Sequence, residues 1–363
     1  MKIAILGTRG IPNNYGGFEE CAEKLALSFV EKGNDVTVYN PASNPYKKKL
    51  WNKVRIKKIF YNEKKLKFLN LFLYDYLCLK NAVKHDYDII LELGYSPCSF
   101  FYYLKKNSNA KIVTNMDGLD WKRSKWNWVA KKILKYSEKL AVKKSDALIA
   151  DNPGIRDYIF KKYVVNSYYI PYGAELYGSS DKKILKDYNL KRYKYYILIS
   201  RLEPENNIET ILDGYIMSEA KEAFILIGPV QNRYYRFLKK KYGNFKNIRF
   251  LGGIYNYEIL YALRSNSKLY FHGHSVGGTN PSLLEAMASN AYIVAHNNIF
   301  NKYVLGSNCF YFSNKFEISE IIINYNDKFR KEYIKNNIDR IKKEFSWEIV
   351  SDKYLKLFSS VRQ

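Results

Sequence analysis

The sequence predicts an α/β protein built from two Rossmann-like, doubly wound domains. Continuous apolar runs alternate with amphipathic runs, which is typical of parallel strands covered by helices on both faces. The alternation begins twice, at "KIAIL" (2–6) and again at "YYILISR" (195–201). The chain of 363 residues also exceeds the roughly 250–300 residues at which a single core stops growing. We therefore expect a first domain over 1–172, a second over 173–345 and a closing helix over 346–363 that crosses back to the first.

The first domain is expected to open with a strand, a glycine-rich loop and a helix. The strand covers 2–6, the loop "GTRGIPNNYGGFEE" covers 7–20, and the helix covers 18–33 and ends at Gly33. Glycine at this density usually serves a tight turn or lets a ligand approach the backbone. Apolar runs predict further strands over 35–40, 87–93, 110–116 and 146–151.

The second domain is expected to repeat this architecture without repeating the sequence. Helices are predicted over 207–220 and 256–266. The segment 168–183 has turn residues and no periodicity, so we expect the domain boundary near it. Strands are predicted over 195–201, 223–229, 247–253, 268–274 and 292–296.

The net charge of +25 favours an anionic partner: nucleic acid, an acidic membrane surface or a phosphorylated substrate. A genome-wide bias toward Lys, Asn, Ile and Tyr is the alternative explanation. We find no nucleic-acid-binding motif, so DNA or RNA binding remains a distant alternative. The basic segment 121–144 is expected to be helical, either lying on anionic lipid or forming an ordinary solvated surface helix. Its apolar positions at helical spacing are Trp126, Val129, Ala130, Ile133, Leu134 and Ala141.

The sequence favours a cytoplasmic protein, with peripheral attachment to the inner face of the plasma membrane left open. It contains neither a signal-peptide pattern nor the roughly 20 apolar residues needed to span a bilayer. The four cysteines are scattered, which favours buried, reduced thiols. The D-x-D at 86–88 precedes a strand instead of following one, and the H-x-H at 272–274 has no further ligands near it in sequence. We therefore expect no metal and no cofactor.

The glycine-rich loop does not fit a nicotinamide-binding enzyme. That fingerprint requires G-x-G-x-x-G and an acidic residue at the end of the second strand. This loop has glycine at 7, 10, 16 and 17, and the second strand ends in Tyr39-Asn40.

The motif "HGHSVGGTNPSLLEAMASN" (272–290) predicts an anion site at a helix N-terminus. Asn280 suits the N-cap and Pro281 the first helical position, so the free N–H groups of the helix would face Gly277 and Gly278. Glu285 would lie one turn into the helix, where a buried carboxylate needs a partner such as sugar hydroxyls. The alternative is a well-capped helix with Glu285 paired to a lysine.

A second motif, "ISRLEPENNIETI" (199–211), places Arg201 at the end of a strand. Ligands of open α/β sheets gather at such strand ends, and arginine offers a fixed fork of donors to a diphosphate. Asn206 and Glu209 also fit a helix capping box.

Taken together, these motifs resemble glycosyltransferase family 4, which has the GT-B fold of two domains facing each other across a cleft. More narrowly, the chain resembles bacterial rhamnosyltransferases of capsule and surface-polysaccharide assembly, and the resemblance covers nearly its whole length. The segments that carry it are "GTRGIPNNYGGFEE", "NMDGLDWKRSKW", "RLEPENNIE", "HGHSVGGTNPSLLEAM" and "FSWEIVSDKYLKLF".

The resemblance implies a retaining transfer of a hexose from a nucleotide sugar, with L-rhamnose from dTDP-L-rhamnose as the leading donor and a UDP-hexose as the alternative. The implied acceptor is a saccharide, lipid-linked at the membrane. Arg201 would hold the diphosphate, Glu285 would bind the ribose, and Gly16 and Gly17 would bring backbone to the donor. Asp117 would face the reacting sugar or the acceptor hydroxyl. In the implied mechanism the departing phosphate takes the acceptor proton.

This sequence departs from the broad family at three positions. Asp117 stands where histidine is common, Gly277 where a glutamate precedes Glu285 by eight residues, and Asn206 where lysine is common. Backbone N–H groups of Gly277, Gly278, Thr279 and Asn280, with the His274 imidazole, would replace the lost contacts.

Overall fold

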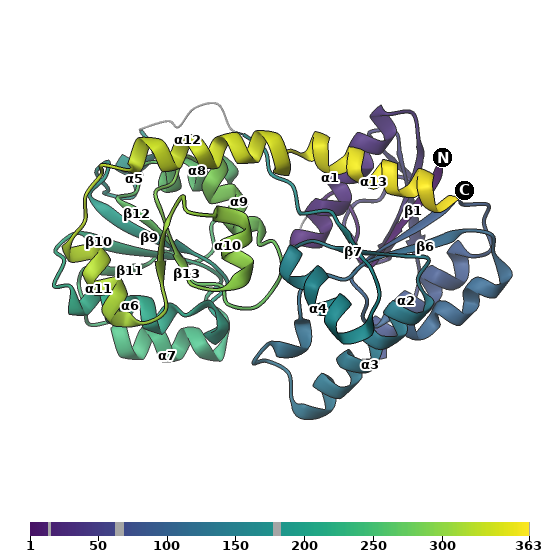
Figure 1. Ribbon diagram of the computed structural model, residues 1–363, viewed down its shortest axis with the longest axis horizontal. Coiled ribbons are helices and arrows are strands. Elements are labelled where there is room, and N and C mark those ends of the chain that lie inside the picture. Colours follow the sequence, from purple (N-terminus) through teal and green to yellow (C-terminus); the bar gives the residue numbers. More distant parts are fainter. Residues whose placement is uncertain (14–15, 62–68, 177–182, 363) are drawn as a thin grey trace. The chain divides into compact units, whose positions relative to one another are not determined.

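The computed structural model describes residues 1–13, 16–61, 69–176 and 183–362 (Figure 1). The chain forms two compact units, Met1–Gly173 with Trp347–Gln363, and Ala174–Ser346. Each unit contains a largely parallel sheet with helices on its faces, so the predicted α/β class with two Rossmann-like domains is confirmed. Asn14 and Tyr15 of the glycine-rich loop lie outside the described residues, as does 177–182 of the predicted boundary segment.

The sheet of unit 1 has the strand order β3-β4-β2-β1-β5-β6-β7-β8. Neighbouring strands are parallel except for β3 and β4. The order reverses between β1 and β5, which is the switch point of a doubly wound sheet. The strands are β1 (Lys2–Leu6), β2 (Asp35–Pro41), β3 (Leu50–Trp51), β4 (Val54–Ile59), β5 (Ile89–Leu93), β6 (Lys111–Asn115), β7 (Ala147–Ala150) and β8 (Tyr168–Tyr169).

Helices α1 and α13 lie side by side on one face of this sheet, and α2 and α3 lie on the other (Figure 1). The ring of Phe29 on α1 packs edge-on against Phe358 on α13, with centroids 5.7 Å apart. The closing helix is therefore part of the core of unit 1. The helical segments are α1 (Gly17–Glu31), α2 (Leu69–Ala82), η1 (Cys98–Asn107), η2 (Asp120–Lys122), α3 (Trp128–Lys144), α4 (Pro153–Tyr163) and α13 (Trp347–Arg362).

The sheet of unit 2 is entirely parallel, with the order β11-β10-β9-β12-β13-β14. Its order reverses between β9 and β12. Helices α6, α7 and α11 cover one face, and α8, α9 and α12 cover the other (Figure 1). The strands are β9 (Tyr195–Ile199), β10 (Ala223–Ile227), β11 (Ile248–Phe250), β12 (Leu269–His272), β13 (Ile293–His296) and β14 (Phe310–Phe312). The helical segments are α5 (Ile184–Asp187), η3 (Pro204–Asn206), α6 (Ile208–Met217), α7 (Arg233–Tyr242), α8 (Tyr257–Ser265), α9 (Pro281–Ala288), α10 (Ile299–Leu305), α11 (Lys315–Ile323), α12 (Arg330–Arg340) and η4 (Ile341–Phe345).

The basic helix is shorter than predicted. It begins at Trp128, because the Asn127 side chain accepts a hydrogen bond from the Ala130 N–H and caps the first turn. The indole N–H of Trp126 instead donates to Asp120 at 3.1 Å. The predicted place of Trp126 on the helix is therefore wrong.

The four cysteines, as predicted, are buried and form no disulfide.

Two glycines of the opening loop are required by the fold itself. At Gly10 the backbone has φ +89°, and a Cβ would lie 2.3 Å from the Asn40 side chain. Asn40 accepts a hydrogen bond from the Ile11 N–H at 3.2 Å and donates to the Ile11 carbonyl at 2.7 Å. At Gly7 a Cβ would lie 2.4 Å from the carbonyl oxygen of Leu93. The Asn40 amide, one residue before the end of β2, therefore holds the loop. A carboxylate could not do so, since it has no N–H to donate.

We predict that Gly10→Ala destabilises unit 1 more than Gly33→Ala does. Both glycines have positive φ, +89° and +80° respectively, but a Cβ at Gly33 meets nothing within 4 Å. Gly33→Ala should cost about 1 kcal/mol for the backbone alone, and Gly10→Ala about 2–4 kcal/mol because Asn40 must also move. The free energy of unfolding in urea measures both, and equal losses would contradict the role of Asn40.

Candidate active site

The switch point of unit 2 brings two of the sequence-predicted segments together. The chain passes from β9 to Arg201, and from β12 to His274. The two connections are joined because Ser275 donates to the Glu205 carbonyl from its N–H at 3.1 Å and from its Oγ at 2.8 Å. The amide of Asn207 also donates to the Gly273 carbonyl at 2.8 Å. Carboxyl ends of strands at a switch point are where this fold binds ligands.

Arg201 lies two residues beyond the last residue of β9, and 55% of its side chain is exposed. Its nearest acidic group is Glu203, with 3.8 Å between the charged atoms. A contact this long and this exposed contributes little, so the guanidinium remains accessible to an anion.

The predicted capping box of Asn206 and Glu209 is wrong. Asn206 is buried, and its amide donates to the Arg201 carbonyl at 2.7 Å. Asn207, in a left-handed conformation, precedes α6 and makes no side-chain cap. The Glu209 carboxylate pairs with Lys241 of α7 at 2.6 Å. Asn206 therefore shapes the connection that carries Arg201, and Glu209 joins two helices.

The N-terminus of α9 is built as predicted. The Asn280 side chain accepts a hydrogen bond from the Ser282 N–H at 3.0 Å, and Pro281 opens the helix. Gly277 has φ +135° and open space where a side chain would be. Thr279 is buried, whereas Gly278 is only partly buried. Free N–H groups with a bare approach favour an anion at this end of α9.

The carboxylate of Glu285 forms an ion pair with an arginine. One of its carboxylate oxygens, Oε2, pairs with Arg264 of α8, whose side chain is 4% exposed. The alternative of a lysine partner is wrong. Among the described residues only Arg264 pairs with Glu285, so Oε1 is available to a hydroxyl group.

Two histidines at the end of β12 stack on each other. The rings of His272 and His274 lie 4.4 Å apart between centroids, inclined by 14°. The His274 carbonyl accepts hydrogen bonds from Asn298 at 3.0 Å and Asn301 at 3.2 Å. His272 is 1% exposed, and neither of its ring nitrogens has a hydrogen-bond partner among the described residues. Burial lowers the pKa of His272 well below its usual value, and the neighbouring His274 lowers it further, so His272 is neutral and supports the His274 ring.

The D-x-D turn, one of the two metal-like patterns of the sequence, makes structural contacts with β1. The described residues contain no group of three or more His, Cys, Asp or Glu side chains that could hold a metal ion. In the D-x-D turn, Asp86 pairs with the Lys2 ammonium at 2.9 Å and Asp88 accepts the Lys2 N–H at 2.7 Å. These carboxylates secure the start of β1.

The remaining sequence-predicted residues, Gly16, Gly17 and Asp117, belong to unit 1. Gly16 is the N-cap of α1, and the Gly17 carbonyl accepts a hydrogen bond from the Tyr172 hydroxyl at 2.9 Å. Asp117 follows β6 with φ +50°, and its N–H donates to Asn115 at 3.0 Å. A non-glycine residue in this conformation is uncommon and is often found at functional sites.

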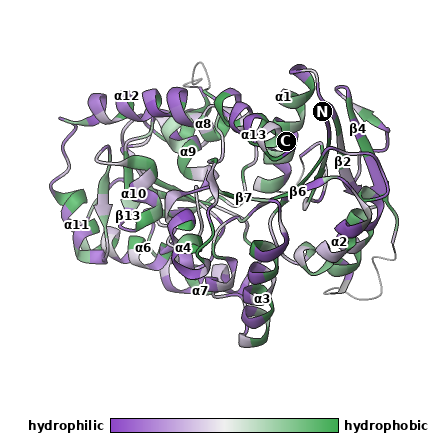
Figure 2. Cartoon of the chain, turned by 45° about the vertical axis from the view of Figure 1, so that its right-hand side comes forward, coloured by the Kyte–Doolittle hydropathy of each residue, from purple (hydrophilic) through white to green (hydrophobic). Residues whose placement is uncertain are grey.

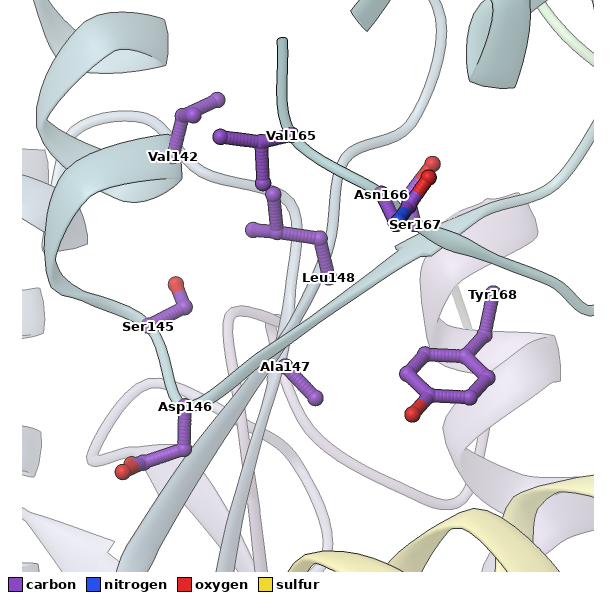
Figure 3. A pocket seen from close by; sticks show the side chains of 9 residues that line it. All are labelled: Val142, Ser145, Asp146, Ala147, Leu148, Val165, Asn166, Ser167 and Tyr168. Atoms are coloured by element: carbon purple, nitrogen blue, oxygen red, sulfur yellow. The ribbon is translucent and has the colours of Figure 1, made fainter. Parts of the chain in front are cut away.

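A shallow pocket of about 390 Å³ lies at the opposite edge of the unit 1 sheet (Figure 3). Ser145 and Asp146 border it where the chain enters β7, and Tyr168 borders it at the start of β8. It therefore lies at the amino ends of the strands and is not part of the candidate site.

Solved structures with the GT-B fold resemble the whole chain. Sucrose-phosphate synthase from Thermosynechococcus elongatus has 15% sequence identity and a TM-score of 0.81, covering 99% of this chain and 98% of that chain. HepE from Anabaena, solved with UDP and glucose, has 17% identity and a TM-score of 0.77, covering 99% and 100%. An α,α-trehalose-phosphate synthase (UDP-forming) from Burkholderia xenovorans has 10% identity and a TM-score of 0.73, again covering 99% and 100%. The chain therefore has the GT-B fold.

The two units match different protein families. Residues 180–340 match the family Glycosyl transferases group 1, and residues 1–175 match a domain of unknown function, DUF1972. None of the curated proteins matches the chain in sequence. The group 1 match includes every candidate residue of unit 2, and together with the fold it supports a glycosyltransferase.

We predict that His272 makes unit 2 less stable in mild acid. The unfolded chain protonates this histidine as the pH falls through about 6.5, but the folded chain does not, so its contribution to stability is lost below that pH. Replacing it as His272→Phe should reduce the fall in unfolding free energy between about pH 7.5 and pH 5.5 by about 1.4 kcal/mol.

The exposed His85 of unit 1 supplies the control as His85→Phe. Urea unfolding at both pH values measures the effect, and the same pH dependence in His272→Phe and wild type would contradict the assignment of His272 as a neutral, buried ring.

Proposed function

We propose that the chain is a hexosyltransferase that uses a nucleotide sugar as donor. The observation that carries this proposal is the convergence of Arg201, the loop 273–280 and the N-terminus of α9 at the switch point of a glycosyl transferases group 1 domain. The guanidinium of Arg201 binds the diphosphate, and the N–H groups of Gly277 to Asn280 add donors around it. The Oε1 atom of Glu285 accepts hydrogen bonds from the ribose hydroxyls.

The proposed transfer retains the configuration of the sugar and requires no metal ion or other cofactor. Negative charge grows on the diphosphate as its bond to the sugar breaks, and Arg201 with the positive end of α9 stabilises that charge. The departing phosphate accepts the proton of the attacking hydroxyl on the same face of the sugar. The protein then contributes by holding the two substrates in position.

The leading donor is dTDP-L-rhamnose, because the motifs around Asp117 and Glu285 resemble those of rhamnosyltransferases. A UDP-hexose is the alternative, which gains support from HepE, solved with UDP and glucose, and from the UDP-forming trehalose-phosphate synthase. In that case the enzyme would be a glucosyl-, galactosyl- or N-acetylhexosaminyltransferase.

We further propose that the acceptor is a saccharide linked to a membrane lipid, with α3 lying on the membrane surface. Helix α3 carries hydrophilic and hydrophobic residues along its length (Figure 2). Trp128 is 69% exposed and Tyr136 53% exposed, and the Lys132 ammonium lies 4.7 Å from the centre of the Trp128 ring. Exposed aromatic rings among lysines suit the interface of an anionic bilayer.

None of the helices within the described ranges is long and apolar enough to cross a bilayer.

A nucleotide-sugar screen with Arg201→Ala tests the donor site. We expect dTDP-L-rhamnose to raise the melting temperature of the wild type more than UDP-glucose does, since a ligand at 100 times its Kd adds about 2.7 kcal/mol of stability. Arg201→Ala should lower turnover by at least roughly two orders of magnitude, the cost of removing one donor to the developing charge. Since Arg201 is exposed, the variant should fold normally.

Arg236→Ala removes an exposed arginine from α7 of the same unit and is the matched control. A larger increase in melting temperature with UDP-glucose than with dTDP-L-rhamnose would favour a UDP-hexose as the donor. No stabilisation by any nucleotide sugar, or normal turnover in Arg201→Ala, would refute the proposed donor site.

Charge reversal on α3 tests the membrane surface. We expect Lys132→Glu with Lys135→Glu to weaken binding to vesicles containing phosphatidylglycerol at least about thirtyfold, since each surface lysine contributes about 1 kcal/mol. Co-sedimentation with vesicles measures the affinity, and pure phosphatidylcholine vesicles should bind neither protein. Lys239→Glu with Lys240→Glu makes the same charge change on α7. Equal losses from both pairs would show that net charge, and not α3, determines binding.

A further inference from the structure

The end of α4 holds an apolar side chain on a strained backbone and in contact with solvent. Val164 follows the last residue of α4 and has the left-handed conformation φ +56°, ψ +37°. Its N–H donates to the Phe160 carbonyl at 2.8 Å and closes the helix. Glycine or asparagine usually takes this position, because a branched side chain is strained there. Val164 is also 80% exposed, so within one chain it buries little apolar surface to offset the strain.

Val164 lies between two other exposed apolar side chains. Phe160 on α4 and Tyr168 on β8 are each 51% exposed, and we call these three residues the β8 patch. Helix α4 connects the parallel strands β7 and β8, so its C-terminal end returns to the amino edge of the unit 1 sheet. Exposed apolar residues that gather in this way often mark a contact with another molecule.

Two pockets adjoin the connection between Val164 and β8. The pocket of about 390 Å³ described above is bordered by Tyr168 (Figure 3). A second pocket, of about 340 Å³, is bordered by Phe160. Asn166 and Ser167 border both pockets. A protruding side chain and two hollows therefore lie within a few residues of one another.

The strand β8 is at the edge of its sheet. It pairs with β7, where Tyr168 lies beside Ile149, and no strand follows it in the sheet order of the described residues. The segment 164–168 reads "VVNSY" and contains neither lysine nor proline, which are residues that protect exposed edges from pairing. An edge of this kind favours pairing with a strand from another chain.

The charged residues that border the two pockets balance one another. The basic ones are Arg156 and Lys161, and the acidic ones are Asp146 and Asp157. The chain as a whole carries a net charge of +25, so two copies repel each other over most of their surface. At the balanced pockets this repulsion is weakest, and an anionic partner gains no attraction there.

We propose that the β8 patch is the interface of a symmetric dimer of this chain. Under a two-fold axis, Val164 of each copy enters a pocket beside β8 of the other. Arg156 and Asp157 are neighbours with exposed side chains, so the same axis brings each next to its opposite charge. A surface that carries both a protrusion and a hollow, and both signs of charge, is self-complementary, as a two-fold interface requires. The inference goes beyond the proposed function and does not depend on it, because the interface leaves the carboxyl edge of the sheet uncovered.

Sedimentation equilibrium of the full chain tests the dimer. We expect the wild type to have twice the mass of one chain at about 100 µM and to dissociate on dilution. Val164→Gly should weaken self-association about a hundredfold, since each dimer loses two central side chains and each contributes about tenfold. At about 1 µM, where the chain is monomeric, Val164→Gly should melt no lower than the wild type, because glycine takes the left-handed conformation without strain. A purely structural role of Val164 would instead lower the melting temperature and leave the mass unchanged.

Phe160→Ser removes a second side chain of the β8 patch and should also weaken the dimer. The control is Phe316→Ser, which changes a similarly exposed phenylalanine on α11 of unit 2 and should leave the dimer intact. A monomeric wild type at about 100 µM, or unchanged dimers in both patch variants, would overturn the proposal. Equal weakening by Phe316→Ser would overturn it as well, by placing the contact elsewhere. Binding of a monomeric wild type, but not of Val164→Gly, to phosphatidylcholine vesicles would overturn it in favour of a membrane.

Discussion

In each unit a pair of adjacent parallel strands sends its connections to opposite faces of the sheet. Right-handed crossovers require this wherever the strand order reverses. Between the two connections the edge of the sheet is left uncovered. In unit 2 those strands are β9 and β12, and in unit 1 they are β1 and β5. The positions of several candidate residues follow from this reversal, because Arg201, His274 and the glycine-rich loop come directly after the strands concerned.

The two uncovered edges differ in charge, although the chain as a whole is strongly basic. At the edge in unit 2, Arg201 is accessible and α9 points its positive end toward the approach, while Glu285 is balanced by Arg264. In unit 1, Asp117 and Asp151 follow the neighbouring strands β6 and β7 at the carboxyl edge of the sheet. The arrangement in unit 2 suits the diphosphate of the proposed donor. The excess of lysine lies elsewhere, including the exposed side of α3.

The sequence was sufficient to predict the fold class and those elements whose pattern depends only on residues close together in the chain. The strands could be recognised as short apolar runs, and the cap of α9 as Asn-Pro ahead of an apolar helix. Contacts between residues that are far apart in the sequence could not be predicted from it. The pairing of Asn40 with the backbone of Ile11, and of Arg264 with Glu285, depends on which strands and helices become neighbours. The prediction of a capping box was wrong for a related reason, because Asn206 donates a hydrogen bond to the Arg201 carbonyl instead of capping α6.

The packing of α13 against α1 has a consequence for the order of events during synthesis. Unit 1 contains residues from both sides of unit 2, so its apolar face around Leu25 and Phe29 stays uncovered until the ribosome has made Tyr354 and Phe358. Unit 2 is continuous in sequence and has all its residues available earlier. Unit 1 therefore stays incomplete, with an exposed apolar surface, until α13 has been synthesised. An exposed apolar surface of this kind is what chaperones bind on a nascent chain.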